Sequence, residues 1–179
     1  MRNDIEKILF SEEDLEKRIA ELGEMITKDY QGKELIVIGI LKGSNIFTSD
    51  LVRKINVPLK IDFMVVSSYG NTTESTGVVR ILKDLENSVE NKHLLIVEDI
   101  VDSGLTLKYL KEILLTRNPA GIKICTLLDK PARRKENVNI DYLGFEVPDE
   151  FIVGYGIDYA EMYRNLPFVG VLKREVYEK

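Results

Sequence analysis

The sequence predicts an α/β fold in which a twisted parallel sheet is flanked by helices. Two observations lead to this prediction. Residues 94–97 are a continuous apolar run and residues 35–41 and 122–128 are predominantly apolar, which is typical of strands buried on both faces of a parallel sheet. Over the first two thirds of the chain these runs alternate with segments of helical spacing. Such alternation favours a parallel sheet with helices on both faces.

Three segments have the apolar spacing of helices. The first covers residues 11–28, where Ser11 can cap the helix with Asp14 three residues later. The second follows the turn at 42–45, and the third follows the turn at 103–106 and ends near 118–119. Their apolar faces carry Leu15, Ile19, Leu22 and Ile26 in the first helix, Phe47, Leu51 and Ile55 in the second, and Leu107, Leu110 and Leu114 in the third.

Strands are expected at residues 35–41, 59–66, 78–82, 94–97, 122–128, 142–146, 151–155 and 168–172. The polar stretch 67–77 has no periodicity and no large aliphatic residue. A loop of this length in a domain is usually functional or disordered. We find no internal repeat and no linker, so residues 1–179 are expected to form one domain.

The composition excludes several classes of protein. A hydrophobic share of 44% and a charged share of 31% are typical of a soluble globular protein. The net charge of −5 does not support nucleic-acid binding, which usually requires a basic surface. No apolar stretch approaches the roughly 18 residues of a membrane span, and no signal peptide precedes the first helix. The single cysteine, Cys125, fits a reducing compartment and lies in an apolar run, so we expect a buried thiol.

The segment 94–106, LLIVEDIVDSGLT, is the most informative about function. Glu98 and Asp99 stand at the end of an apolar strand, and Asp102 follows them. Ligands of open α/β sheets bind at the carboxyl ends of strands. The small-residue turn from Ser103 opens a helix, whose free N–H groups and dipole favour a phosphate. An anion site beside acids suggests a ligand that also carries hydroxyl groups or a magnesium ion.

This segment resembles the phosphoribosyl-pyrophosphate (PRPP) motif of type I phosphoribosyltransferases, in the form of the hypoxanthine-guanine branch. The resemblance covers nearly the whole chain in five separated segments. It implies a purine salvage enzyme of the cytoplasm, a glycosyltransferase with a small hood formed by the terminal segments. This enzyme would transfer the phosphoribosyl group from PRPP to hypoxanthine or guanine with Mg²⁺, and would be a homodimer or homotetramer.

The resemblance also implies a role for each matching residue. Lys42, Gly43 and Arg164 would bind pyrophosphate, and Ser68 and Tyr69 would belong to a lid over the site. Ser103, Gly104, Leu105 and Thr106 would bind the 5′-phosphate, and Glu98 and Asp99 would hold the ribose hydroxyls directly or through metal. Lys130 would donate to the purine O6, Phe151 would stack on the purine, and the backbone of Ile152 would contact the base edge. Glu98, Asp99 and Asp158 would ligate Mg²⁺, and Asp102 would be the catalytic base.

Other interpretations remain open from the sequence. The acids could be solvated groups of an ordinary strand–turn–helix, and Arg164 could form a surface ion pair with Glu161. A nucleotide-sensing regulator of the same fold, or an enzyme for xanthine or a pyrimidine, would share the motif. The cluster Arg133, Arg134 and Lys135 is expected to be a solvated loop. The preference between guanine and hypoxanthine, and whether the peptide bond before Lys42 is cis, are not predicted.

Overall fold

The computed structural model describes residues 1–68 and 79–178. The N-terminal half contains η1 (Arg2–Asp4), β1 (Ile5–Phe10), α1 (Glu12–Asp29), β2 (Leu35–Leu41), α2 (Asn45–Val52), β3 (Leu59–Ser68) and β4 (Val79–Lys83). The C-terminal half contains β5 (His93–Val101), α3 (Leu105–Leu115), β6 (Gly121–Asp129), η2 (Pro131–Arg133), β7 (Tyr142–Glu146), β8 (Ile152–Val153), β9 (Val169–Leu172) and α4 (Arg174–Tyr177). Within residues 1–68 and 79–178, no helix is long and apolar enough to cross a membrane.

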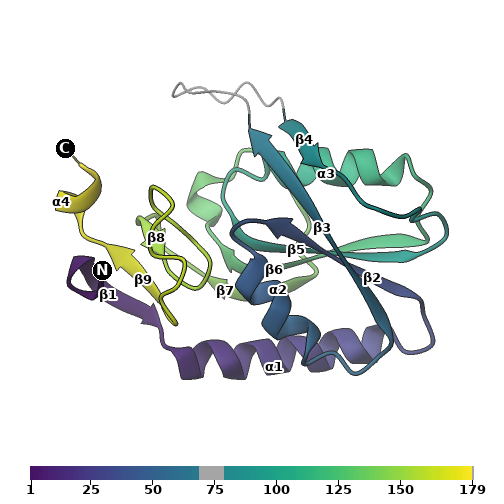
Figure 1. The fold of residues 1–179 in the computed structure, drawn as a ribbon, viewed down its shortest axis with the longest axis horizontal. Coiled ribbons are helices and arrows are strands. Elements are labelled where there is room, and N and C mark those ends of the chain that lie inside the picture. The colour runs from purple at the N-terminus through teal and green to yellow at the C-terminus, as the bar shows by residue number, and fades with distance from the viewer. Residues whose placement is uncertain (69–78, 179) are drawn as a thin grey trace.

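The central sheet is mostly parallel, as expected. Its strand order is β4-β3-β2-β5-β6-β7 (Figure 1). Strands β3, β2, β5, β6 and β7 are paired in parallel, and β4 runs antiparallel to β3. Strands β2 and β5 lie in the middle of the sheet. The end of β5 that carries Glu98 and Asp99 therefore has a neighbouring strand on each side.

Helices cover both faces of this sheet, which confirms the predicted fold class. On one face, Val37 and Leu95 pack with apolar residues of α1 and α2. On the other face, Ile38 and Ile96 pack with Leu107 and its neighbours in α3. Adjacent strand residues point to opposite faces, so continuous apolar runs are needed where both faces are covered. Cys125 is fully buried in the first of these layers, as its sequence context indicated.

A second, smaller sheet has the order β1-β9-β8 and is built from the two ends of the chain (Figure 1). It matches the hood that the family resemblance implied. Strand β1 was not expected, because Glu6 and Lys7 interrupt its apolar pattern and are exposed. Its antiparallel partner β9 lies at the other end of the sequence, so no local signal announces the pairing.

Two other elements are shorter than the spacing predicts. Strand β8 contains only two residues of the expected 151–155, because Gly154, Tyr155 and Gly156 have φ values of 102°, 50° and 101°. Helix α2 ends at Val52, although Ile55 beyond its end is still buried. Helix α1 agrees with expectation, and Ser11 and Asp14 form the predicted capping box.

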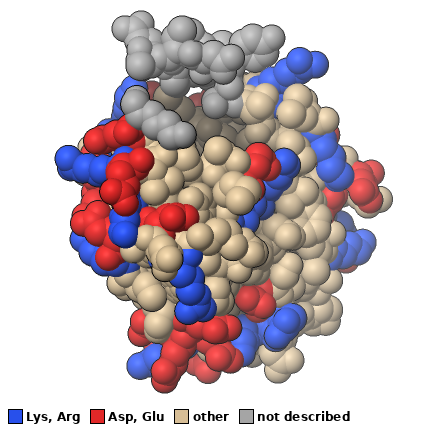
Figure 2. All heavy atoms as spheres, turned by 60° about the vertical axis from the view of Figure 1, so that its left-hand side comes forward, with Lys and Arg blue, Asp and Glu red and all other residues tan. Residues whose placement is uncertain are grey.

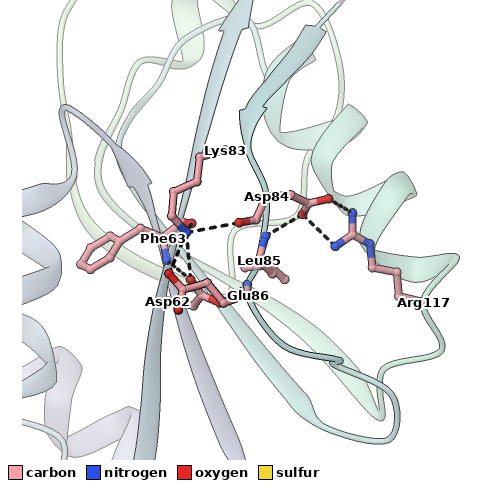
Figure 3. Close-up of polar contacts among 7 residues, drawn as sticks. All are labelled: Asp62, Phe63, Lys83, Asp84, Leu85, Glu86 and Arg117. Carbon is pink, nitrogen blue, oxygen red and sulfur yellow. Dashed lines mark hydrogen bonds and ion pairs between the residues drawn. The ribbon is translucent and has the colours of Figure 1, made fainter.

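A polar network anchors the segment after β4 to the rest of the fold (Figure 3). Asp62 accepts hydrogen bonds from the backbone N–H of Glu86 at 2.9 Å and from Lys83 Nζ at 3.3 Å. Asp84 accepts a bidentate pair from Arg117, just after α3, at 2.8 and 2.7 Å. Burial alone would raise the pKa of Asp62, but the hydrogen bonds that it accepts hold that pKa below its ordinary value. The network therefore links β3, β4 and α3 around the charged form of Asp62.

Acidic and basic side chains are interspersed on the face that Figure 2 shows. No continuous basic area is visible on that face.

Candidate active site

A cavity of about 340 Å³ opens at the carboxyl ends of β2, β3 and β5. This is the position where ligands bind in open α/β sheets. The residues that line it are Ile40, Leu41, Lys42, Gly43, Val66, Glu98, Asp99, Ile100, Val101, Asp102, Ser103, Gly104, Thr106, Leu107, Asp158 and Arg164. Four segments that are distant in sequence thus meet at one site.

The turn before α3 has the geometry of an anion site. Gly104 is the N-cap residue of α3 with φ 82° and has no side chain to cap the helix; the N–H of Leu105 makes only a long hydrogen bond of 3.4 Å to Oγ of Ser103. A Cβ on Gly104 would lie 2.6 Å from the carbonyl oxygen of Glu136, so a glycine is required. Ser103 and Thr106 line the cavity on either side of this turn, but Leu105 is not one of the lining residues. The first backbone N–H groups of α3 are therefore available to a phosphate.

Glu98 and Asp99 form a buried acidic pair in the last residues of β5. The sequence pattern places these two acids at the end of the apolar run 94–97. They lie within β5 instead, because its pairing with β6 continues to Val101. Burial raises the pKa of Glu98 well above its ordinary value, and the charge of Asp99 raises it further. Burial also raises the pKa of Asp99, and the hydrogen bonds that it accepts offset part of this rise. Such a pair favours hydroxyl donors or a cation as its ligands.

The turn after β2 packs tightly against this pair. A Cβ on Gly43 would lie only 1.8 Å from Oδ2 of Asp99, so a side chain at position 43 would displace the carboxylate. The peptide bond between Leu41 and Lys42 is cis. Lys42 is exposed, and its Nζ forms an ion pair with Glu161 at 2.8 Å.

Arg164 also lines the cavity and contacts several acceptors. Its Nη2 lies 2.9 Å from Oδ1 of Asp158, and its Nη1 donates to the carbonyl of Gly156 at 2.8 Å. Oε1 of Glu161, the ion-pair partner that the sequence left open as an alternative, lies 3.5 Å from Nη2. Nε of Arg164 is buried and has no hydrogen-bond partner among the described residues. Arg164 is therefore both an ion-pair residue and a donor with unused capacity at the cavity.

Asp102 also has an unused polar atom. The carboxylate lines the cavity next to Ser103, and its Oδ1 is buried without a hydrogen-bond partner in the described part of the chain. An unpaired buried acceptor is costly, since it has lost its hydration without compensation. Its place in the cavity indicates that a bound ligand supplies the missing hydrogen-bond donor.

The residues expected to contact a purine are not among the residues that line this cavity. Lys130 is 5% exposed, and its Nζ donates to the carbonyl of Glu150 at 2.9 Å. Burial lowers the pKa of Lys130, and the negative charge of Asp102 offsets part of that effect. The ring of Phe151 stacks on Tyr177 with centroids 4.6 Å apart, and Ile152 is buried in β8.

Of the two expected lid residues, only the backbone of Ser68 lies in the described part of the chain. Ser68 is the last residue of β3 and pairs with Val79 in β4. Tyr69 and most of the stretch 67–77 lie outside the described residues.

The expectation of a solvated basic loop was wrong for Arg134. Its side chain is 19% exposed and forms an ion pair with Asp129, whereas Arg133 is 56% exposed. Sequence reasoning also missed Val66 and Ile100 as cavity-lining residues. Nothing in a run of basic residues distinguishes Arg134 from its neighbours, because its partners come from two different strand ends.

The acidic residues fit a magnesium ion only in part. Glu98, Asp99 and Asp158 all line the cavity. Within residues 1–68 and 79–178, however, no three acidic, histidine or cysteine side chains are placed to hold an ion by themselves. Magnesium is commonly held by one or two carboxylates together with substrate phosphates. The donor set therefore suits a magnesium ion that is bound jointly with a phosphorylated ligand.

The comparisons with known proteins agree with this geometry. The sequence model described as the phosphoribosyl transferase domain matches residues 7–160. The chain belongs to the phosphoribosyltransferase family, within its hypoxanthine-guanine branch. A hypoxanthine-guanine phosphoribosyltransferase of Bacillus subtilis is 56% identical over 178 residues, which cover 99% of each chain. A crystal structure of a Staphylococcus aureus hypoxanthine phosphoribosyltransferase has a TM-score of 0.98 at 55% identity and covers 100% of this chain and 97% of that one.

Proposed function

We propose that this chain transfers the 5-phosphoribosyl group from PRPP to hypoxanthine or guanine, giving IMP or GMP and pyrophosphate. The family and the names of its relatives support the reaction class. The observation that carries the residue assignment is Oδ1 of Asp102, which lies in the cavity beside the phosphate turn and has no hydrogen-bond partner among the described residues. That atom is placed to accept a hydrogen bond or a proton from a purine.

The proposed substrate contacts follow from the walls of the cavity. Backbone N–H groups of the turn 103–106 bind the 5′-phosphate. Glu98 and Asp99 accept hydrogen bonds from the ribose hydroxyls. Lys42 and Arg164 bind the pyrophosphate; arginine suits this role because its planar guanidinium donates two parallel hydrogen bonds to an oxyanion.

The purine contacts come from the segment after β6 and from the hood. Lys130 donates to the exocyclic oxygen of a 6-oxopurine, since an ammonium group can donate but cannot accept. Its hydrogen bond to Glu150 uses one of three protons, so two are available. Phe151 stacks on the ring, and the backbone of Ile152 contacts the base edge.

The reaction forms a bond between the purine nitrogen and the anomeric carbon and breaks the bond from that carbon to pyrophosphate. Asp102 accepts the proton that the purine nitrogen loses, as a general base. Lys42 and Arg164 stabilise the negative charge that develops on the leaving group. Bound by Glu98, Asp99 or Asp158 together with PRPP, Mg²⁺ would supply further charge neutralisation on the pyrophosphate.

The same proposal includes the assembly and the location of the enzyme. The site takes residues from Lys42 to Arg164, which supports one domain over residues 1–179. A homodimer or homotetramer in the cytoplasm is what the resemblance implies. Sedimentation equilibrium of the purified chain measures the subunit number directly.

A pyrophosphate-release assay tests the reaction. The chain is mixed with PRPP, Mg²⁺ and one base at a time: hypoxanthine, guanine, xanthine, adenine or uracil. We expect release with hypoxanthine and guanine and formation of the matching nucleotide. PRPP binding without turnover of any base would favour a nucleotide-sensing regulator, and turnover of xanthine or uracil alone would point to a sister enzyme.

A further inference from the structure

The segment after β6 is attached to the catalytic turn through Arg134. Its Nε donates to the carbonyl oxygen of Asp102 at 3.1 Å, and its Nη2 forms an ion pair with Asp129. Both charged side chains are largely buried, with 19% and 15% of their surface exposed. One guanidinium therefore bridges the end of β6 and the turn that carries Asp102.

Backbone hydrogen bonds continue this attachment on both sides. The N–H of Lys130 donates to the carbonyl of Val101 at 3.0 Å. The N–H groups of Lys135 and Glu136 both donate to the carbonyl of Ser103, at 2.9 and 3.0 Å. With Arg134 on the carbonyl between them, three consecutive carbonyls of the turn are held by the segment 130–136.

The aliphatic part of Arg134 also covers the glycine of the turn. A Cβ on Gly104 would lie 3.2 Å from Cδ of Arg134, so the stem of the arginine fills the space that a side chain would need. The guanidinium is planar and offers donors in two fixed directions, which allows it to bind Asp102 and Asp129 at once. A lysine has a single ammonium at the end of a flexible stem and cannot reproduce this bridge.

We propose that Arg134 is a positioning residue for Asp102, tying the catalytic turn to Asp129 and hence to the neighbouring Lys130. The bridge sets the spacing between the proton acceptor and the donor that contact the purine. This inference rests on the proposed function for the roles of Asp102 and Lys130. The bridge itself does not depend on turnover.

The adjacent Arg133 provides a matched control. It is exposed and pairs with Asp149, also exposed, at 2.5 Å. It has the same charge and lies on the same loop, but it contributes no contact to the turn 101–103 in the described structure. Arg133→Met therefore removes an equal charge from the same region without touching the bridge.

The kinetic test is a double-mutant cycle with Asp102→Asn. Misplacing a catalytic group by about 1 Å costs roughly 10²-fold in rate, so kcat of Arg134→Met should fall by about that factor. In the Asp102→Asn background the same change should cost only about 3-fold or less, because residues that act as a unit are not additive. Arg134→Lys should recover little of the loss, and Arg133→Met should retain full kcat. Equal losses in both backgrounds would mean that Arg134 is a general structural residue and would overturn the proposal.

Hydrogen exchange provides a readout that does not require activity. In Arg134→Met the amides of Lys135 and Glu136, which donate to Ser103, should exchange faster than in the wild type, and in Arg133→Met they should not. Asp129→Asn, which is nearly isosteric, should give the same pattern and serves if Arg134→Met folds poorly. Unchanged protection in both variants contradicts the bridge. Changed protection in a protein that releases no pyrophosphate with any base contradicts the proposed function and leaves the bridge supported.

Discussion

Asp102→Asn separates proton transfer from the other tasks of the site. Oδ1 of Asp102 has no hydrogen-bond partner among the described residues, so the change removes no protein hydrogen bond from that atom. Asparagine is nearly isosteric and keeps an acceptor and a donor, but it cannot take up a proton at neutral pH. We therefore expect a folded protein of nearly unchanged melting temperature that binds PRPP almost as well as the wild type.

The size of the loss in kcat follows from the role of a general base. Such assistance is worth about 10²–10⁴-fold, or roughly 3–5 kcal/mol of barrier. A second effect follows from the charge of Asp102, which raises the pKa of Lys130 against the effect of burial. Without that charge the pKa of Lys130 falls further, so the ammonium form is lost at lower pH. The basic limb of the kcat/KM profile for hypoxanthine should therefore move to lower pH.

The assay compares ordinary 6-oxopurines with analogues acidic enough to be deprotonated in solution. An analogue without the proton does not need an acceptor, so Asp102→Asn should lose less with it. An equal loss for both kinds of base would assign Asp102 to electrostatic stabilisation of the sugar cation. Turnover close to that of the wild type would refute the catalytic assignment altogether.

Three further predictions concern other parts of the site and its frame. Lys130→Ala should lower kcat/KM for 6-oxopurines by about 10–150-fold, because a hydrogen bond from a charged donor is worth roughly 1.5–3 kcal/mol; unchanged kcat/KM would remove Lys130 from the base site. Gly43→Ala should raise KM for PRPP and reduce kcat, since its Cβ would lie 1.8 Å from Oδ2 of Asp99; steady-state kinetics beside a melting curve distinguish this from unfolding. Asp62→Asn should lower the melting temperature at pH 7. Because the folded-state pKa of Asp62 is depressed, its contribution is present above the unfolded value near 3.8 and disappears as the pH falls through the folded pKa. A melting-temperature difference that does not shrink as the pH falls below the unfolded value near 3.8 would contradict this origin.

The central sheet could be predicted from the sequence because its signal is local. Strands buried on both faces require continuous apolar runs, and residues 35–41 and 142–146 begin and end where the structure places β2 and β7. The capping box at Ser11 likewise involves only neighbouring residues. The hood could not be predicted in the same way, since β1 pairs with a strand from the opposite end of the chain.

The same distinction between local and long-range signals applies to the residues of the candidate site. Glu98 and Asp99 lie near the end of β5 and Asp102 follows it, so their proximity to the turn before α3 could be predicted from the motif alone. The resemblance added Lys42, Asp158 and Arg164, which do line the same cavity. Arg134 was missed because its role depends on two acceptors, the carboxylate of Asp129 and a backbone carbonyl, that come from different strands.

The glycines of the site show why such long-range requirements are invisible in a motif. Gly154 and Gly156 could be taken for part of a dinucleotide-binding fingerprint, but the structure gives them another reason. Both have left-handed φ, and a Cβ on Gly156 would lie 2.1 Å from the carbonyl oxygen of Gly43. Gly43 in turn has no room for a Cβ beside Asp99. The backbone of the loop that leads to Asp158 therefore packs on the turn of Lys42, and that turn packs on the side chain of Asp99 in β5. Since a protein interior does not deform continuously, a side chain added at either glycine must move the acidic pair as well. The cavity thus depends on two close approaches among three separate segments, which the fold creates and which no single segment encodes.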